Sequence, residues 1–222
     1  KKIKNLEITP EKIYNNRRSF VKSISFGAGL IATTSFPFVN NTLANNESKL
    51  TSYKDITTYN NYYEFGTAKG DPYKNAQDFK IKPWNISIEG EVENPINISM
   101  EEISDEFTSE ERILRLRCVE GWSMVIPWMG FSLNQLLSKV TLTSKAKFVE
   151  FESVYDPEQM KGQRSPVLNW PYKEGLRIDE AMHPLTTVVT GLYNKKLPNQ
   201  NGAPLRIFIP WKYGFKSAKA IV

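Results

Sequence analysis

The sequence has 222 residues, of which 40% are hydrophobic and 24% are charged. This length suits one sizeable domain or two small ones, and the composition predicts a packed core and excludes wholesale disorder. A single cysteine excludes an internal disulfide framework. The net charge of +5 comes entirely from residues 1–22, so the remaining chain is electrically balanced and gives no support to nucleic-acid binding.

Residues 1–44 have the layout of a secretory signal. Arg17 and Arg18 stand in N-R-R-S-F-V-K, which is similar to the twin-arginine export motif, and an uncharged stretch with an apolar centre follows. We expect cleavage after Ala44, and an uncleaved anchor is the alternative, although the apolar stretch is short and polar for a transmembrane helix. Because the twin-arginine route carries folded proteins, this signal also indicates a cofactor that is inserted before export.

Residues 45–222 are expected to form one domain in which strands outnumber short helices. Alternating or β-rich runs predict strands at 84–92, 113–118, 148–155, 186–193 and 205–209. Capping and amphipathic patterns predict short helices at 99–107, 132–140 and around 178–181. The expected fold class is α+β with a dominant sheet. Because residues 220–222 resemble the inside of a further strand, and the first residue is not Met, we expect a C-terminally truncated chain that is also incomplete at its start.

The stretch 113–131, I-L-R-L-R-C-V-E-G-W-S-M-V-I-P-W-M-G-F, contains the single cysteine, Cys118. Its alternation predicts that Leu114, Leu116 and Cys118 share one face of a strand. A thiol at a strand end, beside a turn at Gly121 and two tryptophans, suits a soft metal ligand or a nucleophile. A buried cysteine that only fills space is an equally supported interpretation.

Residues 59–66, Y-N-N-Y-Y-E-F-G, form a dense cluster of aromatic and amide side chains in a polar region. This run is interpreted either as a surface Ω-loop packed by its own aromatics or as a loop that clasps a polar heterocycle. Elsewhere, the sequence lacks the usual nucleotide-binding and zinc-protease fingerprints, and His183 is its only histidine. A thiol hydrolase that pairs Cys118 with His183 is an alternative, although the papain-type sequence around the cysteine is absent.

The segment R-C-V-E-G-W-S-M-V-I-P-W-M-G-F resembles the molybdenum-binding segment of the bacterial sulfite-oxidase-like molybdopterin family. Residues 59–66 are similar to another segment of that family. Three more similar segments follow in the family's order, D-E-A-M-H-P-L at 179–185, Q-N-G-A-P-L-R at 200–206 and P-W-K-Y-G-F-K at 210–216. The resemblance spans residues 50–222 and implies a sulfite-oxidase-like molybdopterin-binding domain whose C-terminal portion is missing from this chain.

The resemblance implies a single molybdopterin without an attached nucleotide, and Cys118 as the catalytic residue and the one protein ligand of the molybdenum. It also implies cofactor contacts from residues that match the family's motifs, namely Asn60, Tyr63, Glu64, Ser153, Asn201, Arg206, Ser217, Ala218 and Lys219. Ser153 stands where the family usually has threonine, and Ser217 begins a turn that is often Gly-Ile-Lys in the family. Without the resemblance, Arg206 and Lys219 would be interpreted as ordinary solvated side chains.

Within this family, the sequence most resembles catalytic subunits that reduce methionine sulfoxide in periplasmic proteins. The resemblance implies oxygen-atom transfer in the periplasm, with electrons from a haem-containing membrane subunit that is fed by quinol. One alternative is sulfite oxidation, which would require a cationic pocket beside the metal. Arg115 and Arg117 weakly disfavour it, because in a regular strand they alternate away from Cys118. A non-catalytic binding module of the same fold is a further alternative.

Overall fold

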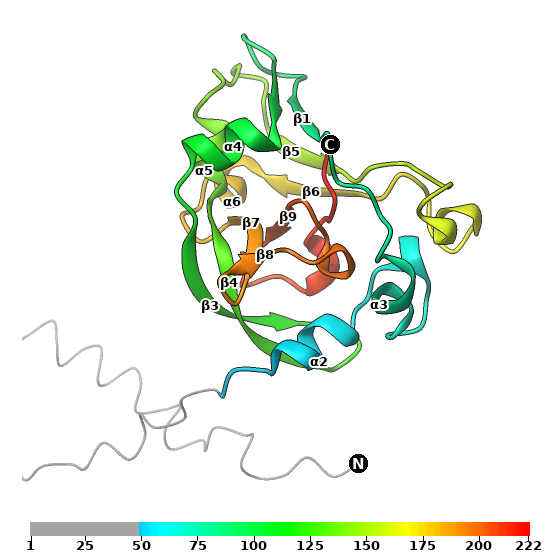
Figure 1. Ribbon diagram of the computed structural model, residues 1–222. Coiled ribbons are helices and arrows are strands. Elements are labelled where there is room, and N and C mark those ends of the chain that lie inside the picture. The colour runs from blue at the N-terminus through cyan, green and yellow to red at the C-terminus, as the bar shows by residue number, and fades with distance from the viewer. Residues whose placement is uncertain (1–48) are drawn as a thin grey trace, which may run out of the picture. The chain divides into compact units, whose positions relative to one another are not determined.

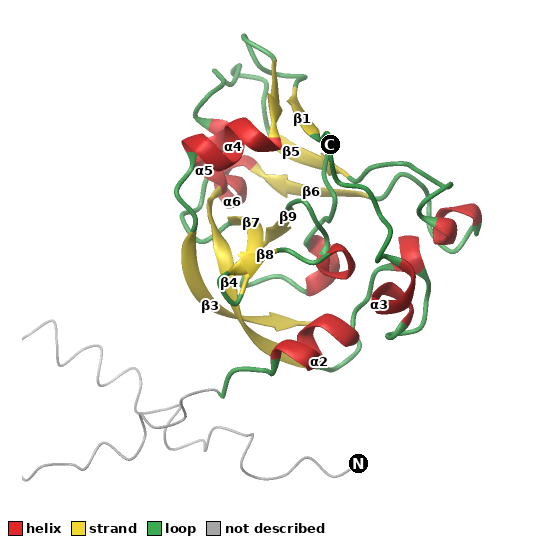
Figure 2. Cartoon of the chain, viewed as in Figure 1, coloured by secondary structure: helices red, strands yellow, loops and turns green. Residues whose placement is uncertain are grey.

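The computed structural model describes residues 49–222, and the expected signal at residues 1–44 lies outside the described residues. In the described part, nine strands form three antiparallel sheets, and no α-helix exceeds seven residues. Figures 1 and 2 show these short helices at the periphery of the sheets. The expectation of an α+β fold with a dominant sheet is therefore confirmed. No helix within residues 49–222 combines the length and the hydrophobicity that crossing a bilayer requires.

The strands are β1 Asn85–Ile88, β2 Ile96–Ser99, β3 Glu110–Arg117, β4 Ser123–Ser132, β5 Phe148–Glu152, β6 Lys173–Arg177, β7 Thr187–Leu192, β8 Lys195–Lys196 and β9 Arg206–Phe208. The α-helices are α2 Tyr53–Thr58, α3 Asp71–Asn75, α4 Met100–Glu106, α5 Leu133–Leu137 and α6 Ile178–Ala181. Four single 3-10 turns complete the set: η2 Tyr63–Phe65, η3 Lys161–Arg164, η4 Asn199–Asn201 and η5 Gly214–Lys216.

The largest sheet is built on the β3–β4 hairpin, which curves along the lower left of the fold in Figure 1. Strand β4 pairs with β7, and β7 in turn pairs with both β8 and β9. The pairing of β4 with β7 shifts register between Met129 and Gly130. A Cβ at Gly130 would lie 2.1 Å from the Val188 carbonyl oxygen, so glycine permits this close approach of the two strands.

The predicted elements agree with the structure where a simple pattern marks them. The capping box at Ser99 and Glu102 begins α4, as expected, and the predicted strand at 113–118 is β3, which ends at Arg117. The prediction missed β2, β4, β6 and the two-residue β8. Strand β4 is buried over most of its length and contains Pro127, so it shows no alternation and carries a residue that usually interrupts strands. The expected final strand is only an isolated bridge between Ser153 and Ile221.

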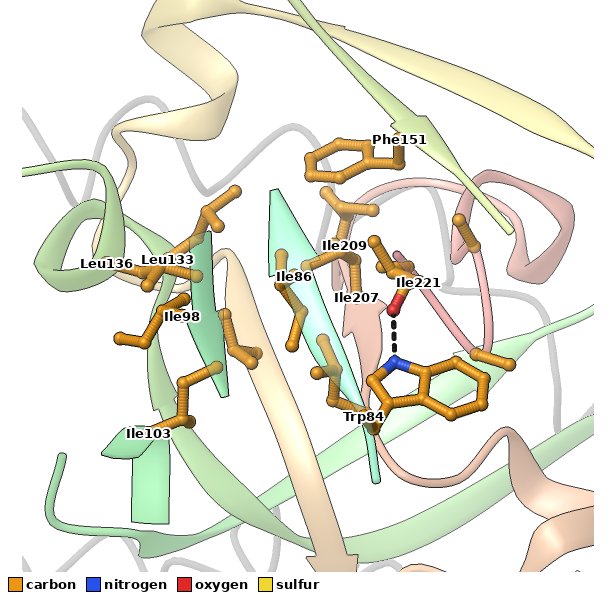
Figure 3. Close-up of a cluster of buried hydrophobic side chains, with 14 of the residues drawn as sticks. Trp84, Ile86, Ile98, Ile103, Leu133, Leu136, Phe151, Ile207, Ile209 and Ile221 are labelled. Carbon is orange, nitrogen blue, oxygen red and sulfur yellow. Dashed lines mark hydrogen bonds between the residues drawn. The ribbon is translucent and has the colours of Figure 1, made fainter. Parts of the chain in front are cut away.

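The larger core cluster ties the two ends of the described chain together. Ile86 on β1 faces Ile98 on β2, and Leu133 and Leu136 of α5 pack beside them (Figure 3). The Trp84 indole Nε1 donates a 2.7 Å hydrogen bond to the Ile221 carbonyl oxygen, drawn as the dashed line in Figure 3. A second cluster surrounds Trp128 of β4, whose side chain is fully buried. These clusters fix the strands whose ends carry the site described next.

Candidate active site

Cys118 lies in the tight turn that joins β3 to β4. Its N–H donates to the Trp122 carbonyl oxygen at 2.8 Å, and its own carbonyl oxygen accepts from the Gly121 N–H at 3.1 Å. Gly121 has a φ of +85°, which is typical of a three-residue hairpin loop closed by a left-handed glycine. The sulfur is therefore attached to a hydrogen-bonded turn at the end of the longest hairpin in the described chain, and not to a flexible loop.

A cavity of about 370 Å³ opens beside this turn. Residues from the 60–64 segment, the hairpin turn, β9 and the C-terminal segment line it together. Six of the ten residues that the resemblance implies are on its wall: Asn60, Tyr63, Glu64, Cys118, Arg206 and Lys219. Residues up to 159 positions apart in the sequence thus meet around one sulfur atom. The predicted contact roles of these residues stay predictions.

Tyr63 and Glu64 reach the cavity because η2 is held by a close neighbour. A Cβ at Gly162 of η3 would lie 1.9 Å from the Tyr63 carbonyl oxygen and 2.8 Å from that of Glu64. Only a glycine allows the two backbones to approach so closely. The contact places Glu64, which is 5% exposed, against the inner wall of the cavity.

The other four predicted residues, Ser153, Asn201, Ser217 and Ala218, do not line the cavity. The Asn201 Nδ2 donates to the Asn60 Oδ1 at 3.0 Å, and the Asn201 carbonyl oxygen accepts from the Arg206 Nη1 at 2.9 Å. Ser217 and Ala218 are buried on the segment that leads to Lys219, which bridges to Arg206. Ser153 is buried at the end of β5. In the described structure, Asn201 positions two cavity residues, whereas Ser153 has no contact with the cavity.

The cavity wall carries two cations close to each other, the buried Arg206 and the half-buried Lys219. Burial lowers the pKa of Arg206 to about 10, and burial together with repulsion from Arg206 lowers the pKa of Lys219 to about 8. The one buried carboxylate nearby is that of Glu64, whose pKa is raised by burial and is lowered in part by Lys219. Two cations facing a carboxyl group that is itself hard to ionise form a site for an anion.

Several buried polar atoms around the cavity have no hydrogen-bond partner within residues 49–222. They include the Asn60 Nδ2, the Asn61 Oδ1 and the Arg206 Nε. Native proteins pair nearly all of their buried polar atoms, so a cluster of unpaired ones indicates a polar ligand. A pterin ring presents donors and acceptors along its edge, and a phosphate accepts charge-assisted hydrogen bonds from arginine and lysine. The residues of this cavity therefore fit the molybdopterin that the resemblance implies.

The structure also reveals residues near Cys118 and along the cavity that the sequence did not single out. The Asn61 Nδ2 donates to the Cys118 Sγ at 3.2 Å, and Asn61 itself lines the cavity. Lys69 forms a 2.6 Å ion pair with Glu120, which follows Cys118 by two residues. Tyr172 is a further residue of the wall. Asn61 could have been found, because it lies within the 59–66 segment, whereas nothing in the sequence marks Lys69 or Tyr172.

The hydrolase alternative finds no support in the geometry. His183 does not line the cavity that Cys118 lines. Its ring packs edge-on against Trp211 at 4.6 Å, and its Nδ1 accepts from the Leu185 N–H at 3.1 Å. These contacts describe a structural histidine.

Arg115, which bears on the sulfite alternative, lies outside the cavity wall. Its Nη1 donates to the Ser123 Oγ at 3.1 Å.

Comparison with known families decides between these interpretations. Residues 73–222 match the family described as the oxidoreductase molybdopterin binding domain. This chain belongs to that family. The sulfite-oxidase-like expectation is thereby confirmed, and the chain is a molybdopterin-dependent oxidoreductase, which implies a molybdenum cofactor.

Several relatives within the molybdopterin-binding family share about half of their residues with this chain. The protein-methionine-sulfoxide reductase catalytic subunit MsrP of Xanthomonas axonopodis pv. citri is 50% identical, over 97% of this chain and 71% of its own length. MsrP of Burkholderia mallei is 48% identical, over 97% of this chain and 70% of its own. MsrP of Pseudomonas syringae pv. tomato is 45% identical, over 99% of this chain and 73% of its own length.

The fold has a more distant structural relative. The crystal structure of the sulfane dehydrogenase SoxCD from Paracoccus pantotrophus superposes with a TM-score of 0.54 at 12% identity. The match covers 96% of this chain and 58% of that one. At this identity the likeness shows the fold alone, and it agrees with the molybdopterin-binding domain.

Proposed function

We propose that this chain is the catalytic subunit of a protein-methionine-sulfoxide reductase. The observation that carries the proposal is the Cys118 sulfur, which lies on a hydrogen-bonded turn beside a cavity lined by two cations, Arg206 and Lys219, and by unpaired polar atoms. The proposed reaction is the one for which relatives of 45–50% identity are named. When bound, a pterin-held molybdenum supplies oxygen-atom transfer, in which a sulfoxide oxygen is removed and leaves as water after two electrons and two protons are delivered.

The cavity supports a single molybdopterin without a nucleotide. Its volume of about 370 Å³ is at the lower end of the range of small-ligand sites, which suits one compact heterocycle. Cys118 would ligate the metal, and Arg206 and Lys219 would hold the phosphate at the far end. Asn60, Tyr63 and Glu64 would bind the pterin edge, while Asn201 would orient Asn60 and Arg206.

The remaining predicted residues, Ser217, Ala218 and Ser153, do not line the cavity. Ser217 and Ala218 form the turn that brings Lys219 beside Arg206, so the proposal gives them backbone roles at the phosphate. Ser153 has a buried hydroxyl without a partner in the described chain, and its role in cofactor binding stays a prediction.

The cavity mouth supports a protein substrate. Val119, Leu168 and Phe215 line the cavity and are 62%, 36% and 47% exposed. An apolar rim of this kind suits the aliphatic part of a methionine side chain and the neighbouring residues of a polypeptide. A small inorganic anion such as sulfite would gain nothing from it, so the rim favours reduction of methionine sulfoxide over sulfite oxidation.

Export and an electron-supplying partner complete the proposal. The twin-arginine-like sequence around Arg17 and Arg18 supports a periplasmic location after export in the folded state, with repair of oxidised periplasmic proteins as the role. The relatives are named catalytic subunits, which supports a second subunit. A haem-containing membrane subunit fed by quinol would supply the electrons.

The proposed function is tested with the full chain exported from cells that make molybdopterin. We expect about one molybdenum per chain and turnover of free and protein-bound methionine sulfoxide with an artificial electron donor. Cys118→Ala should abolish turnover, because the metal loses its only protein ligand. Metal content is measured by mass spectrometry alongside sulfite oxidation. Wild-type protein without molybdenum, or with sulfite as its better substrate, would contradict the proposal.

A further inference from the structure

The contact between Asn61 and Cys118 joins two parts of the chain that are far apart. Asn61 lies between α2 and η2, and its Nδ2 donates to a sulfur 57 residues away at 3.2 Å. This distance is well within the range of hydrogen bonds to sulfur. No local turn creates the contact, so it exists only because the tertiary structure brings the 59–69 segment onto the hairpin turn.

The other end of the same amide is left without a partner. The Asn61 Oδ1 is buried and unpaired within residues 49–222, and Asn61 lines the cavity. Hydrogen bonding of the nitrogen to the sulfur determines which way the amide is oriented. Asn61 therefore presents a donor to the sulfur and leaves an acceptor for a donor group that enters the cavity.

Three further contacts fix the segment that carries Asn61. The Tyr59 ring packs edge-on against Trp122, with ring centroids 5.3 Å apart. The Lys69 Nζ pairs with the Glu120 carboxylate at 2.6 Å, and the Lys69 carbonyl oxygen accepts from the Asn60 N–H at 2.9 Å. The 59–69 segment thus contacts the hairpin turn through three residues, Tyr59, Asn61 and Lys69. The Asn61–Cys118 hydrogen bond is the central contact.

We propose that Asn61 is a positioning residue, which orients the Cys118 sulfur for ligation and raises the reduction potential of the molybdenum by hydrogen bonding to its thiolate ligand. The inference rests on the proposed function. An N–H donor withdraws charge from a metal-bound sulfur, and this favours the more electron-rich, reduced state of the metal. Groups that hold a ligand in this way typically contribute about 10–100-fold to metal affinity or activity.

The test replaces the amide with side chains of similar size that cannot donate. Asn61→Leu and Asn61→Asp both remove the N–H group, and the aspartate also adds a negative charge. The full-length protein is purified with its cofactor, and the midpoint potential of the molybdenum is measured by redox titration followed by electron paramagnetic resonance. We expect a lower potential in both variants, with the larger shift in Asn61→Asp, and an unchanged potential in the control Asn97→Leu, whose residue is exposed on β2.

Molybdenum content and the melting temperature are measured on the same samples. A folded variant that loads several-fold less molybdenum than the control also supports the inference, because the sulfur is then less well placed for ligation. If Asn61→Leu does not fold, the midpoint potential and the molybdenum content of the isosteric Asn61→Asp test the inference. Variants with the molybdenum content and potential of the wild type would overturn the inference while leaving the proposed function intact. Wild-type protein without molybdenum would instead overturn the proposed function and this inference with it.

Discussion

At Lys219, burial and the neighbouring guanidinium of Arg206 lower the side-chain pKa to about 8. The usual value is 10.5, so the folded chain without its cofactor binds this proton less tightly than the unfolded chain does. A bound phosphate would reverse this, because it stabilises the charged form of both cations. Lys219 therefore lowers the stability of the domain without its cofactor, and its charge would favour a bound anion. Residues of functional sites often reduce stability in this way.

This linkage predicts a pH dependence in the cofactor-free chain. Below pH 8 the charged Lys219 is destabilising, and the free energy of unfolding should rise as the pH increases from 8 to 10.5, by at most about 3 kcal/mol. In Lys219→Met this rise should be absent and the variant should be the more stable protein at pH 7. Urea unfolding at pH 7 and pH 10 measures both effects.

The control for this measurement is Lys145→Met, since Lys145 is an exposed lysine far from the cavity wall. It should keep the wild-type response to pH. Identical pH profiles for the wild type and Lys219→Met would show that Lys219 does not carry this unfavourable charge.

At the scale of the element, the β3–β4 hairpin sets where the sulfur lies. Its eight register pairs end at Arg117 and Ser123, and Cys118 and Trp122 come next. The three-residue loop 119–121 between them depends on the positive φ of Gly121. A hairpin loop of this type has one favoured geometry, because its twist must match that of the strands. The position of Cys118 therefore depends on the strand register, which is held by the core cluster around Trp128.

Gly121→Ala tests this dependence. The space around a Cβ at this position is open, so the cost is the left-handed backbone alone, about 1–2 kcal/mol in the free energy of unfolding. Because the strain can be relieved only by shifting the turn, we also expect a several-fold loss of molybdenum content.

Gly90→Ala is the matched control, since Gly90 has a φ of +92° and equally open space in a turn that does not line the cavity. It should lose similar stability in denaturant titrations and keep its molybdenum. Equal loss of molybdenum in both variants would mean that stability in general, and not the turn at Cys118, controls loading.

At the scale of the whole molecule, the cavity is assembled where separate parts of the domain meet. The 60–64 segment, the hairpin turn, β9 and the segment after η5 each contribute one wall. The loop that contains Leu168 and the turn that contains Phe215 form the apolar mouth. The less exposed part of the wall is therefore cationic and the more exposed part apolar, and under the proposed function this would separate cofactor binding from substrate binding.

This separation predicts that a change at the mouth affects the substrate and not the cofactor. Leu168→Glu places a charge where the proposed polypeptide substrate packs, so KM for oxidised protein should rise by at least about tenfold. The molybdenum content should be that of the wild type. Steady-state kinetics with an oxidised protein and with free methionine sulfoxide measure the effect, which should be smaller for the free amino acid.

Val167→Glu serves as the control, because Val167 is the exposed neighbour that does not line the cavity. If both substitutions leave KM for oxidised protein unchanged, the apolar mouth is not the substrate surface.

The sequence alone gave the elements that follow simple periodicities or capping rules. The Ser99–Glu102 capping box and the alternation before Cys118 each depend on neighbours within a few residues, and both were predicted correctly. Strand β4 could not be predicted, because its burial on both faces removes the alternation that marks a strand. For the site, the motifs predicted six of the residues that line the cavity, although their contacts with one another were not visible.

The tertiary structure decided which residues act on the sulfur. The sequence determined the type of chemistry, because its motifs identify the molybdopterin-binding family, and it predicts Cys118 as the metal ligand. The hydrogen bond from Asn61, the ion pair of Lys69 with Glu120 and the low pKa of Lys219 arise only when distant segments are packed together. Their physical reason is the same in each case: hydrogen bonds and charges act over a few ångströms of space, whereas sequence patterns record only neighbours along the chain.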